Sequence, residues 1–92
     1  MIKILKNYKE MPKWKTAVLT KWATRRIAYH SITDGELADT FEKYDIKEYS
    51  SEKGCLNFVK RWKRWEVGIT AGQKSVDQWI IVSAWKRKLF KG

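Results

Sequence analysis

The chain has 92 residues, which is the size of one small domain. Hydrophobic residues make up 43% of it, which is enough apolar material for a packed core and excludes a disordered chain. A single Cys and a single His exclude a disulfide-stabilised scaffold, a cysteine-rich zinc site and most histidine-based catalysis. We therefore expect one domain over residues 1–92, with no enzymatic activity, no metal and no other cofactor.

The chain is strongly basic, with 20 Lys and Arg residues, 10 Asp and Glu residues and a net charge of +10. Residues 1–30 carry eight basic residues and one acidic residue, and residues 55–92 carry nine basic and two acidic residues. The intervening residues 31–54 carry three basic and seven acidic residues. Such an excess of positive charge on a small domain indicates a polyanionic partner, with nucleic acid as the first candidate.

No apolar run in the sequence is long enough for a signal peptide or a membrane span. The longest candidate, residues 79–85, is far shorter than the roughly 20 residues that cross a bilayer. A lone cysteine is typical of a reducing compartment. We therefore expect a cytoplasmic protein that does not contact a membrane.

Two helices are predicted in the first half of the chain. Pro12 suits the start of a helix over residues 13–30, because the first helical N–H needs no partner. The apolar stripe of this helix consists of Trp14, Val18, Trp22 and Tyr29. Thr33 and Glu36 have the spacing of a capping box, which predicts a second helix over residues 34–44. The apolar stripe of the second helix consists of Leu37, Phe41 and Tyr44.

A third helix is predicted over residues 51–66, with Ser51 as its cap. At 100° per residue, one side is apolar and consists of Cys55, Phe58, Val59, Trp62 and Trp65. The other side is basic and polar and consists of Lys53, Asn57, Lys60, Lys63 and Arg64, with Arg61 at its flank. Cys55 and both Trp residues are therefore expected in the core, and His30 is expected to be structural or exposed.

The last segment, residues 76–85, is compatible with a helix or a strand. Ser75 and Gln78 have capping-box spacing, and three basic residues at 86–88 suit a helix C-terminus, so we favour a helix. The β-branched run at 80–82 favours a strand that pairs with residues 65–70 as a hairpin. The predicted fold is therefore mostly α, with three or four helices, and the alternative carries a C-terminal β-hairpin.

Residues 33–66 resemble the helix-turn-helix of small repressor-type DNA-binding domains. The resemblance lies in the run Glu36-Leu37-Ala38 on a capped helix, in Ile46 after a break, and in the basic helix that follows. It implies that the 51–66 helix enters the major groove of DNA. With a C-terminal hairpin the layout resembles a winged helix, with Gln73 and Lys74 at the tip of the wing.

These features predict a small non-enzymatic regulator from a phage or mobile element that binds duplex DNA, with transcription as the regulated process. Lys and Arg neutralise phosphates, Arg recognises guanine and Asn recognises adenine. Since one short helix reads few base pairs, we expect a homodimer. The predicted nucleic-acid-binding residues are Ser51, Lys53, Asn57, Lys60, Arg61, Lys63 and Arg64. Secondary phosphate contacts are predicted at Arg26, Lys86, Arg87 and Lys88.

Two alternatives remain open at this point. The first is a small basic protein that binds and inhibits a protein or ribonucleoprotein partner, since Trp and Arg are the commonest hot-spot residues of interfaces. The second is an RNA or single-strand binder in which exposed Trp62 and Trp65 stack on bases.

Overall fold

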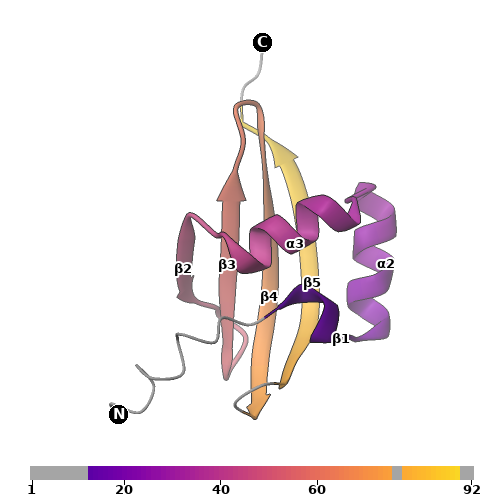
Figure 1. The fold of residues 1–92 in the computed structure, drawn as a ribbon, viewed down its shortest axis with the longest axis vertical. Coiled ribbons are helices and arrows are strands. Elements are labelled where there is room, and N and C mark those ends of the chain that lie inside the picture. The colour runs from indigo at the N-terminus through magenta and orange to yellow at the C-terminus, as the bar shows by residue number, and fades with distance from the viewer. Residues whose placement is uncertain (1–12, 76–77, 90–92) are drawn as a thin grey trace.

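The structure, a computed structural model, describes residues 13–75 and 78–89. It begins with a 3-10 turn, η1 (Trp14–Thr16), a short strand, β1 (Val18–Leu19), and two helices, α2 (Lys21–His30) and α3 (Asp34–Glu42). Four strands follow: β2 (Ile46–Tyr49), β3 (Cys55–Arg61), β4 (Trp65–Ser75) and β5 (Gln78–Lys88). The five strands form one sheet in the order β1-β5-β4-β3-β2 (Figure 1). The prediction of a mostly helical fold was wrong, because this is a mixed α/β fold built on a five-stranded sheet.

The predicted helix over residues 51–66 is replaced by a β-hairpin. Residues 51–54 form a turn, in which Gly54 has a φ of 78° that favours glycine. The rest of the segment is β3, a three-residue turn and the start of β4, with Phe58 paired to Ile69. The apolar residues that suit one face of a helix also suit a strand buried on both faces. Pairing with β4 therefore determines that this segment is a strand and not a helix. The helix-turn-helix resemblance over residues 33–66 is therefore wrong.

The predicted helix over residues 13–30 is also divided. Thr20 accepts a hydrogen bond from the backbone N–H of Ala23 at 3.0 Å and starts α2 at Lys21. Before it, β1 pairs in parallel with β5, with Val18 opposite Ile80. The predicted stripe is not a core face, since the exposed fraction of Trp22 is 54% and that of Tyr29 is 74%.

The favoured helix in the last segment is wrong as well. β5 runs from Gln78 to Lys88 and pairs antiparallel with β4 along its length. A hairpin is therefore present, as in the alternative prediction, but it belongs to the five-stranded sheet and not to a winged helix. Gln73 and Lys74 lie within β4. None of the helices in the described residues has the length and apolar character needed to cross a membrane.

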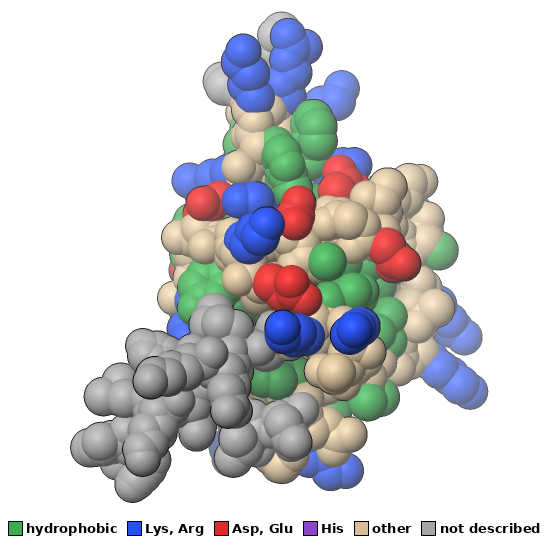
Figure 2. Space-filling model, viewed as in Figure 1, with side chains coloured by type: hydrophobic (Ala, Val, Ile, Leu, Met, Phe, Trp, Pro, Cys, Tyr) green, Lys and Arg blue, Asp and Glu red, His purple; other side chains and the backbone are tan. Residues whose placement is uncertain are grey.

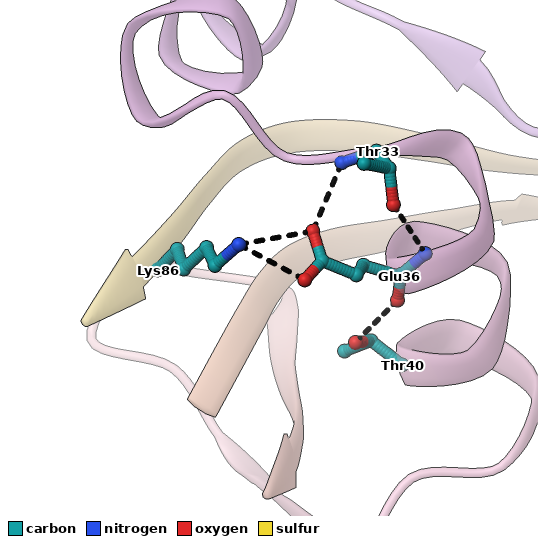
Figure 3. A network of polar contacts seen from close by, with 4 residues as sticks. All are labelled: Thr33, Glu36, Thr40 and Lys86. Carbon is teal, nitrogen blue, oxygen red and sulfur yellow. Dashed lines mark hydrogen bonds and ion pairs between the residues drawn. The ribbon is translucent and has the colours of Figure 1, made fainter. Parts of the chain in front are cut away.

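The capping box of α3 is confirmed. The Thr33 hydroxyl accepts from the Glu36 N–H at 3.1 Å, and the Thr33 N–H donates to the Glu36 carboxylate at 3.0 Å. The same carboxylate accepts from Nζ of Lys86 on β5 at 2.9 Å (Figure 3). Burial alone raises the pKa of Glu36, but the hydrogen bonds from Thr33 and Lys86 outweigh it and hold this pKa below its usual value of 4.5.

Replacing Lys86 by Gln is expected to lower the free energy of unfolding at pH 7 by about 1 kcal/mol and to weaken its acid dependence. Because the pKa of Glu36 is depressed in the folded state, its carboxylate stabilises the fold above pH 4.5. That stability is lost as the pH falls through the folded-state value. Urea unfolding at pH 7 and pH 3.5 measures both effects. Lys88→Gln, on the exposed end of the same strand, is the control, and equal acid dependence in the two variants would contradict the assignment.

Both helices pack on one face of the sheet. The buried core joins Ala23 of α2 and Leu37 and Phe41 of α3 to the strands. The strand residues of this core point to the same side of the sheet. They are either directly paired on neighbouring strands or two residues apart on one strand. They are Phe58, Val67, Ile69, Ala71, Ile81 and Ala84. Figure 1 shows α3 crossing β3, β4 and β5, with α2 beside β5.

Candidate nucleic-acid interface

The opposite face of the sheet has no helix over it in the described part of the chain (Figure 1). Its side chains form three rows across β3, β4 and β5 that follow directly from the strand register. The rows are Arg61–Glu66–Arg87, Val59–Gly68–Trp85 and Asn57–Thr70–Ser83. We call this surface the helix-free face. It carries one charged, one apolar and one polar row, and the charged row lies nearest the β3–β4 turn.

The apolar row depends on a glycine. The indole ring of Trp85 lies against Gly68, so closely that a Cβ atom at position 68 would overlap the ring atoms Cζ2, Cε2 and Cη2. Gly68 therefore permits an aromatic ring to lie against the sheet. Val59, on the other side of Gly68, is buried. Trp85 itself is half-buried and forms an apolar surface at the centre of the face.

The charged row is built around a buried carboxylate. Only 3% of the Glu66 side chain is exposed, and its two oxygens accept from two different arginines. Nε of Arg61 donates to Oε1 at 3.0 Å, and Nε of Arg87 donates to Oε2 at 2.7 Å. The two arginine side chains remain 54% and 67% exposed. Asp45 is also close, since its Oδ2 accepts from the backbone N–H of Arg61 at 2.8 Å.

Five cationic residues meet at this end of the sheet. The β3–β4 turn is closed by a bond from the Trp62 N–H to the Trp65 carbonyl at 2.8 Å. The end of β5 is tied to the same turn by a bond from the Leu89 N–H to the Arg64 carbonyl at 2.9 Å. We call this surface the basic end; its residues are Arg61, Lys63, Arg64, Arg87 and Lys88, all exposed. Figure 2 shows Lys and Arg side chains gathered where the hairpin projects.

The two Trp residues of this end pack against the core, as the sequence indicated. Trp62 and Trp65 stack on each other, with ring centroids 5.8 Å apart and planes inclined by 17°. Nζ of Lys60 lies 5.9 Å from the Trp62 ring and Nζ of Lys86 lies 5.2 Å from the Trp65 ring. Their rings are therefore engaged with each other and with lysines, which weakens the prediction that they stack on unpaired bases.

Lys60 and Lys86 lie on the helix-covered face and not with the basic end. Nζ of Lys60 donates to the carbonyl of Lys43 at 3.3 Å. Lys86 pairs with Glu36 as described above. Both lysines therefore have partners within the protein, and the structure gives them a role in holding α3 to the sheet.

Of three further predicted residues, two lie beyond the far end of β3 and the third, Asn57, lies within that strand. Ser51 and Lys53 lie in the turn between β2 and β3, at the opposite end of that strand. Asn57 lies on the helix-free face, where its Oδ1 accepts from the Thr70 hydroxyl at 2.7 Å. This bond leaves the amide NH₂ of Asn57 as a donor on the open surface.

Cys55 is buried beside the β2–β3 turn, as predicted. Burial, and then the charge of Glu52, raise the pKa of the Cys55 thiol, which disfavours the reactive thiolate. A pocket of about 570 Å³ lies next to it and is lined in part by Tyr49, Leu56 and Trp79. This pocket lies at the end of β3 away from the basic end.

Arg26, a predicted secondary phosphate contact, lies on α2 among aromatic rings. Its guanidinium carbon lies 5.5 Å from the Trp22 ring and 5.0 Å from the Tyr29 ring. Its Nη2 contacts Nε2 of His30 at 3.0 Å. Burial, and then the charge of Arg26, lower the pKa of His30 and favour the neutral ring. Arg26 and the basic end are therefore built on different elements.

Sequence reasoning missed Glu66, Gly68, Ser83 and Trp85. For Glu66 and Gly68 a signal was present, because small and polar residues alternate with apolar ones over residues 65–70, which is the period of a strand with one open face. Residues 83–87 show no such alternation. Among the described residues, no cluster of three or more His, Cys, Asp or Glu side chains is placed to hold a metal ion. The chain matches no known protein family, no curated protein and no solved structure.

Proposed function

We propose that the protein binds duplex DNA through the basic end, with the β3–β4 hairpin as the element that enters the major groove. The observation that carries this proposal is the presence of five exposed cations from two separate segments at one end of the sheet, where two of them, Arg61 and Arg87, share the buried carboxylate of Glu66. The carboxylates of Glu66 and Asp45 offset two of those five charges, so a positive surface remains for a polyanion. Neutralising phosphates there releases condensed counterions, which drives binding.

The shape of the hairpin supports a duplex over a single strand. A two-stranded β-ribbon fits the major groove of B-DNA, and sheet-based readers of DNA use this geometry. The turn at the end of the ribbon carries Lys63 and Arg64 at its exposed tip. Behind the tip, the amide of Asn57 is a donor that can read a base edge. One ribbon reads few base pairs, so the proposal includes a homodimer, and it also includes a cytoplasmic regulatory role.

Replacing Lys63, Arg64 and Lys88 together by Gln is expected to remove most of the salt-dependent affinity. With five phosphate contacts, raising the salt from 50 to 200 mM weakens binding by about 500-fold, and with two contacts by about 12-fold. Fluorescence anisotropy with a labelled duplex, measured across this salt range with single-strand competitor, gives both values. The wild-type protein should still bind a subset of duplex sequences at 150–200 mM salt. At this salt the dissociation constant of nonspecific electrostatic binding is roughly micromolar or weaker.

The matched control is a triple variant that loses the same charge elsewhere. Lys21, Lys47 and Lys53 are exposed on α2, on β2 and in the β2–β3 turn. Their replacement by Gln is expected to leave the salt dependence within about twofold of the wild-type value. Equal losses in both triple variants would mean that net charge, and not the basic end, controls binding. Stronger retention of the single strand would replace duplex DNA with a single-stranded target.

A second candidate function rests on α2. Trp22 and Tyr29 are largely exposed and flank Arg26, and α2 contains no acidic residue. Exposed Trp, Tyr and Arg are typical of protein interfaces, so this surface favours the alternative of a basic inhibitor that binds an acidic protein partner. Under this alternative all duplexes dissociate together as the salt rises. The triple variant at Lys63, Arg64 and Lys88 still binds and inhibits the protein partner.

A further inference from the structure

The arginine pair of the charged row is held in one defined orientation. Each guanidinium uses its Nε–H on a separate oxygen of Glu66, at 3.0 Å for Arg61 and 2.7 Å for Arg87. The carboxylate lies 3% exposed beneath the two side chains, and both hydrogen bonds are charge-assisted. A long arginine side chain normally loses conformational entropy when it binds a ligand. Here Glu66 has already restricted both side chains in the free protein.

The bonds to Glu66 leave the outer ends of both guanidinium groups for a ligand. A guanidinium has five N–H donors, and the Nη groups present a planar fork that matches the oxygens of a phosphate. Both arginines extend from the same face, because Arg61 pairs with Glu66 and Glu66 with Arg87 across adjacent strands. The two guanidinium groups supply the positive charge for an anionic phosphodiester, beside the carboxylates of Glu66 and Asp45.

We propose that Arg61, Glu66 and Arg87 form a preorganised binding site for one backbone phosphodiester of the nucleic acid, with Glu66 as the positioning residue. This inference rests on the proposed nucleic-acid binding and assigns a distinct role to a negative charge inside a cationic surface. If Glu66 only offset positive charge, removing its charge would strengthen binding to a polyanion. If Glu66 positions the arginines, removing its charge weakens binding. The two accounts predict opposite signs.

The test is the affinity of the full chain for two duplexes of unrelated sequence, measured at about 50 mM salt with Glu66→Gln. We expect a loss of about tenfold for both duplexes, although the variant gains one unit of positive charge. Equal or tighter binding overturns the proposal. A loss confined to one duplex overturns the phosphodiester assignment in favour of base recognition, because backbone contacts carry no sequence information.

A second variant covers the case in which Glu66→Gln does not fold, as judged by circular dichroism. The double variant Arg61→Lys/Arg87→Lys keeps every charge on exposed side chains but removes both planar forks. It is expected to bind about tenfold more weakly, whereas Arg64→Lys, at the turn and with no carboxylate beneath it, stays within about twofold. Equal effects of these two changes overturn the proposal. If the wild-type protein binds neither duplex, the proposed function fails first, and this inference with it.

Discussion

Replacing Phe41 by Ala is expected to lower the free energy of unfolding by about 3–5 kcal/mol, the largest effect of any single change considered for this chain. Phe41 is fully buried at the centre of an aromatic cluster that joins α3 to the sheet. Its ring centroid lies 5.9 Å from that of Trp14, 5.1 Å from that of Phe58 and 5.7 Å from that of Trp79. The substitution removes all three ring contacts and leaves a cavity that the surrounding rings fill only in part.

Small domains are stable by only about 5–15 kcal/mol, so the Phe41→Ala variant is expected to be close to unfolding at 37 °C. Urea denaturation at 15 °C, followed by Trp fluorescence, measures the change. Phe41→Leu keeps most of the volume and is the control, with an expected loss of less than about 1.5 kcal/mol. A loss below about 1 kcal/mol for Phe41→Ala would contradict the placement of α3 over the sheet.

Replacing Gly68 by Ala is expected to lower the free energy of unfolding by about 1–3 kcal/mol. The new methyl group would occupy the space of the Trp85 ring, so the indole must leave its position over the sheet. The change should also shift the emission of Trp85, and it should alter nucleic-acid binding if the helix-free face takes part. Urea denaturation together with the emission spectrum of the variant measures both consequences.

The control for this prediction is Gly35→Ala. Gly35 lies in the first turn of α3, where the nearest atom to an added Cβ is Oγ1 of Thr33 at 4.0 Å. Ala at this helical position is expected to leave the stability unchanged or raise it by about 0.5–1 kcal/mol. The opposite ordering of the two variants, with Gly68→Ala the more stable, would show that Trp85 does not lie against Gly68.

Local signals predicted one element well. The Thr33–Glu36 capping box placed the start of α3, and the stripe through Leu37 and Phe41 correctly identified its buried face. These signals lie within a few residues of one another, so they can be recognised in the sequence without knowledge of distant partners. The helix ends at Glu42 and not at residue 44, which is within the usual uncertainty of helix ends.

The strands could not be predicted in the same way, because their partners lie far along the sequence. Phe58 and Val59 are both buried, one on each face of β3, and this pair is equally compatible with one side of a helix. The choice between the two depends on Ile69 and Gly68, which pair with them from β4. The helical spacing of apolar residues over 51–66 is therefore present in the sequence, but it arises from a strand that is buried on both faces.

The candidate site was predicted in its residue types but not in its geometry. Arg61, Lys63 and Arg64 were expected to act together, and the sheet adds Arg87 and Lys88 to them from the end of β5. The same topology removes Lys53 to the far end of β3. Charge is visible in a sequence, but which charges share a surface is decided by the strand order.

The most direct test of the central claim is a titration of the ¹⁵N-labelled protein with a short duplex, followed by the shifts of its backbone amide signals. The account predicts that the largest shifts fall at residues 61–66 and 85–88, which are the two segments that build the basic end. Residues 51–54 and 21–30 should shift little. Shifts concentrated on residues 21–30, or spread evenly over every exposed lysine, would contradict the claim that the basic end is the nucleic-acid interface.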